Sequence, residues 1–194
     1  MRIVSGEYRG RRLSAPKGDE TRPTTDRVRE ALFSSLVSYA GANLGGGRAL
    51  DAFAGSGALG FEALSRGVEH VTFLERERPA LGVLRANADT LGAARSVIIV
   101  SGDTSYLAER GAIPGGPFSL LLLDPPYRLD AGEVGQLVAT LVARDLLEED
   151  ALIVYEHSSV SEAVWPADVT ALASKRYGST TVDIARYERG AGST

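Results

Sequence analysis

The chain has 194 residues, of which 44% are hydrophobic and 24% charged, and it contains no cysteine. Such a composition is typical of a globular protein, and the missing cysteines exclude disulfides, catalytic thiols and cysteine-bound zinc. No apolar run approaches the roughly 20 residues of a membrane span, and the two histidines, His70 and His157, lack the spacing of metal ligands. We therefore expect a cytoplasmic protein with no membrane anchor and no metal site.

The net charge of −4 is unevenly distributed along the chain. Residues 1–30 hold eight basic and five acidic side chains, whereas residues 31–194 hold 13 basic and 20 acidic ones. A positively charged arm suits an anionic partner such as nucleic acid. The sequence thus predicts a basic N-terminal extension, residues 1–40, in front of a main domain formed by residues 41–194.

The extension contains two predicted elements. Residues 2–15 alternate loosely between polar and apolar and include two glycines, which favours a short hairpin. After a turn at residues 16–19, the capping residues 24–26 precede apolar side chains at helical spacing, which predicts a helix up to Tyr39. The glycine-rich segment 40–47 then separates the extension from the main domain.

The main domain alternates between strands and helices. Strands are predicted at 49–53, 70–75, 97–100, 119–124 and 151–156, with helices between them at 59–65, 79–91, 104–109 and 133–144. This alternation predicts a parallel sheet with helices on both faces. The last two strands, 171–176 and 180–188, are separated by three residues, too few for a crossover helix, so they should form an antiparallel hairpin. We expect an α/β fold with a seven-stranded, mostly parallel sheet.

A glycine-rich turn follows the first of these strands, and three acidic residues fall at strand ends. The turn is Ala54-Gly55-Ser56-Gly57, where glycine allows tight turning and close approach of a ligand. Asp51 precedes the turn, and Glu75 ends the next strand, where a carboxylate can accept hydrogen bonds from ribose hydroxyls. Asp103, followed by Thr104, comes after the third strand, within reach of an adenine amino group.

Two kinds of ligand fit these residues. A dinucleotide would satisfy the glycine turn and Glu75, but an acid directly before the turn suits a cation better than a pyrophosphate. S-adenosylmethionine carries an adenosine, an ammonium and a sulfonium, and it matches all three acidic positions. Each acid alone could equally be a helix cap or a solvated turn, but the carboxyl ends of parallel strands share one edge of the sheet. We therefore expect S-adenosylmethionine as the cofactor.

The tetrapeptide Asp124-Pro125-Pro126-Tyr127 directly follows the apolar run 120–123. Two prolines end the strand and stiffen the loop, because they lack backbone N–H groups and disfavour helix. The loop offers a carboxylate, free carbonyls and an aromatic ring, which together suit a flat base bearing an amino group. A plain strand-terminating turn is the alternative. We expect all four residues to form the catalytic site.

These motifs resemble those of class I S-adenosylmethionine-dependent methyltransferases, and in particular the RsmD-type bacterial 16S rRNA (guanine-N2)-methyltransferases. The resemblance covers nearly the whole chain and is strongest in residues 2–6, 9–13, 21–24, 27–33, 51–60 and 124–127. It implies a Rossmann-like fold and methyl transfer to the exocyclic N2 of one guanine in 16S rRNA. It also implies that the substrate is an assembled or nearly assembled small ribosomal subunit, and we expect a monomeric enzyme.

In this interpretation Asp124 accepts one N2–H of the guanine, the Pro125 carbonyl accepts the other, and Tyr127 stacks on the base. The base must leave its helix to be reached. Phosphate or rRNA contacts are expected from six arginines of the extension: Arg9, Arg11, Arg12, Arg22, Arg27 and Arg29. For Arg27 and Arg29 the alternative is the solvated face of a helix, and for Arg22 it is the cofactor carboxylate.

Other functions remain open on the sequence alone. The glycine turn and the Asp-Pro-Pro-Tyr element also occur in DNA adenine-N6 and protein glutamine-N5 methyltransferases. A non-catalytic ribosome-assembly factor that binds a nucleotide is an alternative from another class. Tyr155, Trp165 and the pair Glu156-His157 are interpreted as core packing and a strand-end turn, outside the site.

Overall fold

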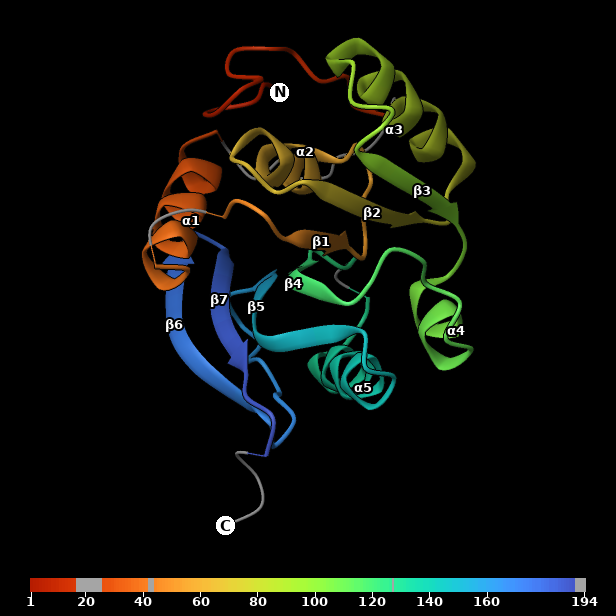
Figure 1. Cartoon of the computed structure of the whole chain (residues 1–194). Coiled ribbons are helices and arrows are strands. Elements are labelled where there is room, and N and C mark those ends of the chain that lie inside the picture. The colour runs from red at the N-terminus through yellow and green to blue at the C-terminus, as the bar shows by residue number, and fades with distance from the viewer. Residues whose placement is uncertain (17–25, 42–43, 127, 191–194) are drawn as a thin grey trace.

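A seven-stranded sheet with the order β3-β2-β1-β4-β5-β7-β6 forms the centre of the molecule (Figure 1). The computed structural model describes residues 1–16, 26–41, 44–126 and 128–190. The strands are β1 (Arg48–Asp51), β2 (His70–Glu75), β3 (Val97–Ser101), β4 (Phe118–Leu123), β5 (Leu147–Ser158), β6 (Val169–Tyr177) and β7 (Thr180–Tyr187). The helices are α1 (Asp26–Tyr39), α2 (Ala58–Ser65), α3 (Arg78–Leu91), α4 (Thr104–Glu109) and α5 (Ala131–Ala143).

Strands β1 to β5 are parallel, and β7 runs antiparallel to both β5 and β6, which confirms the predicted sheet and its C-terminal hairpin. The second strand of the hairpin, β7, lies inside the sheet, and the first, β6, forms its edge. Composition explains this order. Val182 and Ile184 of β7 are buried, whereas Lys175 and Arg176 of β6 are exposed, as is usual for an edge strand.

Helices cover both faces of the sheet: α1, α2 and α3 lie on one face, and α4 and α5 lie on the other (Figure 1). Because side chains alternate along a strand, β4 contributes to both cores. Leu120 and Leu122 pack in the core beneath α1 to α3, and Leu121 and Leu123 pack in the core beneath α4 and α5. Within the described residues, no helix is both long and apolar enough to cross a membrane.

The main difference from the predicted elements concerns β5, which begins at Leu147 rather than at residue 151. Residues Glu148-Glu149-Asp150 near the start of this strand are exposed and charged. Such residues are typical of a loop, so the sequence did not indicate a strand there. The structure incorporates these residues through an irregularity in the pairing with β4, where Leu147 pairs with Phe118. Asp150 there adopts a positive φ of 63°.

The N-terminal residues form a minimal hairpin, closed by one antiparallel bridge between Arg2 and Arg12. We call residues 1–16 the arm. Ile3 and Leu13 of the arm are buried in the core beneath α1 to α3. The backbone of the arm is also bound to α2, because Glu62 accepts hydrogen bonds from the N–H groups of Val4 at 2.8 Å and Ser5 at 3.1 Å. The arm is therefore part of the packed structure.

The topology determines where a ligand site can form. From β1 the chain winds to β2 and β3 on one side, and then crosses back to β4 on the other side of β1. The loops that follow β1 and β4 consequently diverge, and they leave a crevice at the carboxyl ends of these strands.

Candidate functional site

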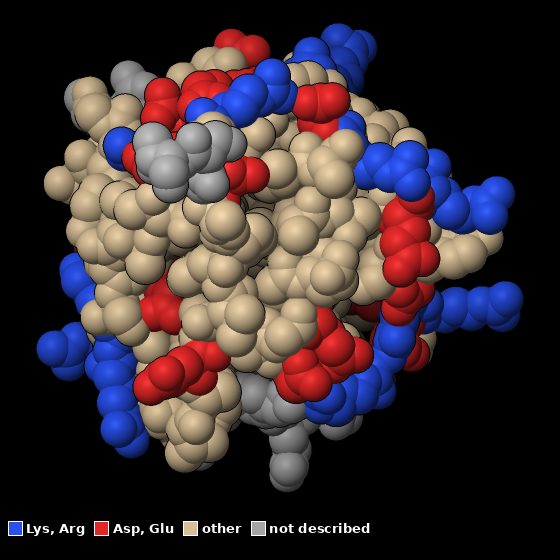
Figure 2. All heavy atoms as spheres, turned by 90° about the horizontal axis from the view of Figure 1, so that it is seen from below, with Lys and Arg blue, Asp and Glu red and all other residues tan. Residues whose placement is uncertain are grey.

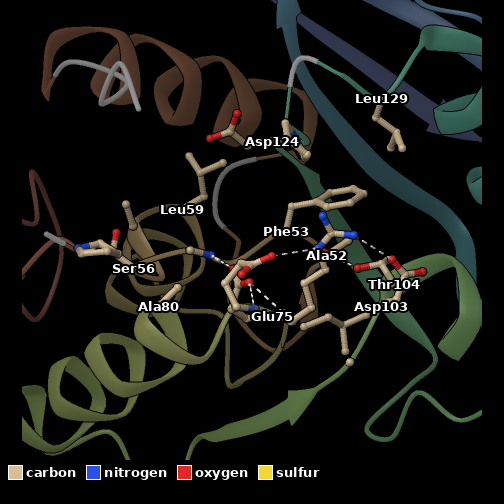
Figure 3. A pocket seen from close by; sticks show the side chains of 18 of the residues that line it. Ala52, Phe53, Ser56, Leu59, Glu75, Ala80, Asp103, Thr104, Asp124 and Leu129 are labelled. Atoms are coloured by element: carbon tan, nitrogen blue, oxygen red, sulfur yellow. Dashed lines mark hydrogen bonds and ion pairs between the residues drawn. The ribbon is translucent and has the colours of Figure 1, made fainter. Parts of the chain in front are cut away.

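A cavity of about 410 Å³ opens at this edge of the sheet, and its volume is within the roughly 300–1,000 Å³ of small-molecule sites. Glu75, Asp103 and Thr104 lie together on one side of it, and Asp124 lies across the cavity from Glu75 (Figure 3). Seven of the predicted catalytic and cofactor-binding residues line it: Gly55, Ser56, Glu75, Asp103, Thr104, Asp124 and Pro126. Arg29, which was predicted to contact RNA, also lines it. Four others, Asp51, Ala54, Gly57 and Pro125, are not among the lining residues. Tyr127 lies outside the described residues.

The two glycines of the turn serve different purposes. Gly55 has a φ of +53°, and a Cβ added to it would meet no atom within 4 Å, so its backbone faces open space in the cavity. Gly57 has a φ of +83°, and its added Cβ would lie 2.5 Å from Leu84 and from Phe61. Gly55 thus allows close approach of a ligand, whereas internal packing requires Gly57.

Glu75 organises the wall of the cavity next to this turn. One carboxylate oxygen accepts the Gly55 N–H at 2.8 Å, and the other accepts the N–H groups of Arg76 and Glu77, each at 2.7 Å (Figure 3). A carboxylate has about four lone-pair sites, so one remains for a ligand hydroxyl. Glu75 therefore ties the glycine turn to the start of α3 and keeps a single free acceptor.

Asp103 and Thr104 connect the cavity to α4. The Asp103 carboxylate caps α4 by accepting the Tyr106 N–H at 3.1 Å, and its other oxygen pairs with Arg76 at 3.3 Å. The buried Thr104 hydroxyl donates to the Ala52 carbonyl, which holds the end of β1 in place. Asp103 is thus a helix cap and also a residue of the cavity wall.

Asp51 occupies a different position from the predicted one. Its side chain is 2% exposed and accepts the Gly60 N–H at 3.0 Å, so it supports the turn from behind instead of lining the cavity. Burial raises the pKa of Asp51 from 3.8 to about 7; the Gly60 hydrogen bond lowers it, and the charge of Glu75 raises it further. Asp51 therefore does not line the cavity, contrary to the position beside a cationic ligand that we expected from the sequence.

Asp124 lies at the end of β4 and is accessible to solvent through the open side of the cavity. Protein encloses its carboxyl on the other sides. This enclosure, together with the negative charges of Glu156 and Asp51, raises the pKa of Asp124 well above its ordinary value. Because opposite charge favours the ionised form of an acid, a cation bound in the cavity would lower this pKa and make Asp124 a better hydrogen-bond acceptor.

The cavity also includes residues that the sequence analysis missed. Phe53 is half-buried on the wall, and Arg128 is exposed at the cavity directly after the Asp-Pro-Pro-Tyr element. Phe53 directly precedes the glycine-rich turn and Arg128 directly follows the Asp-Pro-Pro-Tyr element. Their positions next to these two motifs could have identified them as residues of the site. Met1 and Pro16 line the cavity as well, and only the folding of the arm brings them there.

Most arginines predicted to contact RNA are exposed. Arg9, Arg12 and Arg27 are exposed, and none of them forms an ion pair within the described part of the chain. Arg11 is exposed too, but it donates to the carbonyls of Thr90 and Leu91, at 3.4 and 3.2 Å, and so caps the end of α3. Arg22 lies outside the described residues.

The prediction that Arg29 contacts RNA is wrong, because its side chain is only 1% exposed. It pairs with Asp26 at 2.7 Å, lies 3.9 Å from the fully buried Glu62, and donates to the Arg2 carbonyl at 2.8 Å. These partners hold the arm, α1 and α2 together. Arg29 is therefore a structural residue and neither an RNA contact nor part of a solvated helix face.

Known proteins share this sequence and this fold. The family model described as "Conserved hypothetical protein 95" matches residues 1–186. Ribosomal RNA small subunit methyltransferase D of Escherichia coli (strain K12) is 38% identical over 156 residues, which cover 80% of this chain and 74% of that protein. The protein of the same name from Haemophilus influenzae is 35% identical over 180 residues, which cover 92% of this chain and 89% of that protein.

The fold agrees with this similarity. The solved structure of the Escherichia coli protein yhhF has a TM-score of 0.82 and 32% sequence identity, and the match covers 97% of this chain and 98% of that one. The residues 1–186 that the family model matches include the arm and all of the hairpin except its last residue. The chain belongs to the RsmD-type family of ribosomal RNA small subunit methyltransferases.

Proposed function

We propose that this protein transfers a methyl group from S-adenosylmethionine to the exocyclic N2 of a guanine in the 16S rRNA of the small ribosomal subunit. The main observation is the position of Asp124, which faces the cavity opposite Glu75 and the open backbone of Gly55. Family membership supports the reaction class and the RNA substrate. The N2 position rests on the resemblance and on the chemistry of the Asp-Pro-Pro-Tyr element.

The residues of the cavity fit the proposed cofactor. Glu75 has one free acceptor for a ribose hydroxyl, and Gly55 leaves room for close approach of a ligand to the backbone. Phe53 and Leu129 supply apolar surface for an adenine ring. When bound, S-adenosylmethionine would present an electrophilic methyl group on its sulfonium.

Asp124 would align the acceptor base. The lone pair of the guanine N2 is delocalised into the ring, so the nitrogen is a weak nucleophile. Accepting one N2–H at Asp124, and the other at the Pro125 carbonyl, would fix the nitrogen in line with the donor methyl group. Positive charge develops on the nitrogen during transfer and strengthens both hydrogen bonds, which favours the transition state over the ground state.

Contacts with the RNA backbone are proposed for three exposed arginines of residues 1–40 that form no ion pair within the described part of the chain, Arg9, Arg12 and Arg27. On the face of the molecule seen from below in Figure 2, acidic and basic side chains lie close to one another around an uncharged centre. That face therefore offers no continuous basic surface to a polyanion.

Labelling with a tritiated methyl donor tests the proposal. We expect unmodified small ribosomal subunits to be labelled, and duplex DNA and release-factor protein not to be. Asp124→Ala should lower turnover by roughly 10²-fold or more while the fold and the cofactor affinity stay unchanged, the affinity being measured by calorimetry. Labelling of DNA or protein alone would contradict the substrate, and near-normal turnover of the variant would remove Asp124 from the mechanism.

A further inference from the structure

Helix α3 presents two arginines and a glycine on its outer surface. Arg78 and Arg85 are exposed and lie two helical turns apart, so they share one side of the helix. Gly82 lies between them and is exposed, and a Cβ added there would meet no atom within 4 Å. Glycine in a helix interior is less stable than alanine, and here neither packing nor backbone conformation requires it. Because Gly82 has no side chain, a ligand can come close to the backbone of α3 at this position.

The side chains of the two arginines differ from those of other arginines in their contacts within the described part of the chain. Among the described residues, neither Arg78 nor Arg85 forms an ion pair or a hydrogen bond through its side chain, whereas Arg66 is paired with Glu62 and Arg189 with Asp145. Unpaired guanidinium groups on a chain of net charge −4 favour an anionic partner. Guanidinium also matches phosphate geometry with two hydrogen bonds.

The arm lies against the opposite side of α3. The Ser14 N–H donates to the Asn87 side chain at 2.9 Å, and the Asn87 amide donates back to the Ser14 carbonyl at 3.1 Å. At 100° per residue, Asn87 points about 160° away from Arg85 around the helix. Arg9 and Arg12 of the arm are exposed as well, and Arg11 of the arm donates to the carbonyls at the end of α3, so the arm brings further basic side chains close to this helix.

The outer surface of α3 carries small side chains and one acidic residue beside the arginines, and its N-terminal end adjoins the cavity. Gly82 and Ala86 are exposed, as is Asp89 four residues after Arg85, and Glu77, which precedes Arg78, lines the cavity. None of the large hydrophobic side chains that are exposed in the described structure belongs to α3. Small residues bordered by arginines are better suited to a sugar–phosphate backbone than to an apolar protein surface.

We propose that the outer face of α3, with Arg78, Gly82 and Arg85, binds the phosphate backbone of the rRNA that flanks the target nucleotide. The proposal rests on the proposed function, since it takes small-subunit rRNA as the partner. Arg78 and Arg85 are about 10 Å apart along the helix. Each arginine therefore contacts a different phosphate.

Binding measured across a series of salt concentrations tests this surface. The probe is radiolabelled unmodified small-subunit RNA, used free and within isolated small subunits. The double variant Arg78→Ala/Arg85→Ala should bind RNA roughly tenfold more weakly than the wild type. Its salt slope, the slope of log affinity against log salt concentration, should decrease in magnitude by about 1.4 to 1.8, the value expected for the loss of two phosphate contacts. The KM for RNA should rise, while kcat at saturating RNA stays unchanged because the cavity is intact.

Two further variants separate the surface from net charge and from folding. Lys175→Ala/Arg176→Ala makes the same change in charge on β6, at the opposite end of the sheet from α3, and should bind as the wild type does. Gly82→Gln places a side chain with good helix propensity on the proposed RNA-binding surface. The melting temperature of this variant should be no lower than that of the wild type, and its affinity for RNA should be weaker.

The outcomes distinguish this inference from the proposed function. If the wild type labels small subunits but the α3 double variant has the salt slope and KM of the β6 control, the α3 surface is wrong and the function stands. If the wild type labels no small-subunit RNA, the proposed function fails whatever the α3 variants do. Unchanged RNA affinity of a well-folded Gly82→Gln variant would also overturn the α3 surface.

Discussion

Replacing Asp51 by Asn tests the electrostatics of the acidic residues behind the cavity. The pKa of Asp51 rises from 3.8 to about 7 in the folded protein, first because the carboxyl is buried and then because Glu75 is negative. The folded state therefore binds the proton more tightly than the unfolded chain does. Protein stability accordingly falls as the pH rises from about 4 to about 7, and it is constant again above the folded pKa.

The magnitude follows from linkage, with about 1.4 kcal/mol for each unit of pKa difference. Between about pH 5 and about pH 8, ionisation of Asp51 should cost the wild type about 2 to 3 kcal/mol. Asn does not ionise, and its carbonyl oxygen can still accept the Gly60 N–H. The stability of Asp51→Asn relative to the wild type should therefore increase by about 2 to 3 kcal/mol over this pH range.

Urea unfolding of both proteins at the two pH values measures this difference. Comparing the two pH values removes any fixed effect of the substitution on the hydrogen bond to Gly60. Asp145→Asn is the control, because Asp145 is an exposed partner of Arg189 and should leave the pH dependence nearly unchanged. A pH-dependent difference of less than about 1 kcal/mol would show that the Asp51 carboxyl is not destabilised by its burial.

Two more substitutions test the anchoring of the arm and the wall of the cavity. Glu62→Gln should destabilise the fold by about 3 to 5 kcal/mol, because it removes the charge that faces the buried Arg29 and the partly buried Arg66. A loss below about 1 kcal/mol in urea unfolding would contradict this role. Glu75→Gln should weaken cofactor affinity by about 10-fold to 100-fold, since one amide oxygen cannot accept all the hydrogen bonds of the carboxylate. Titration calorimetry measures it, and wild-type affinity would mean that Glu75 is not needed for binding.

Local patterns were sufficient to predict the architecture. Apolar runs separated by helical spacing indicate parallel strands and crossover helices, and the three-residue link at 177–179 allows only a hairpin. Because the carboxyl ends of parallel strands share one edge, the positions of Glu75, Asp103 and Asp124 along the chain already brought them to one cavity. The extent of β5 was missed, since its charged residues 148–150 are typical of a loop.

The burial of individual charges depends on contacts between distant segments. Arg27 and Arg29 are two residues apart on one helix, yet Arg27 is exposed and Arg29 is buried against Glu62, 33 positions further along the chain. Asp51 and Asp124 both follow buried strands, yet Asp51 supports Gly60 from behind and Asp124 faces the cavity.

The sequence by itself therefore determined the fold class, the edge of the sheet that carries the site and the family that the chain resembles. Only the tertiary structure decided which charged side chains face the cavity and which ones hold the protein together. It also showed that the exposed arginines of α3, beside an open glycine, pair with none of the residues described. The physical reason is the range of the interactions. Backbone preference and hydrophobic periodicity act over a few neighbouring residues, whereas burial and ion pairing depend on groups that meet only after the chain has folded.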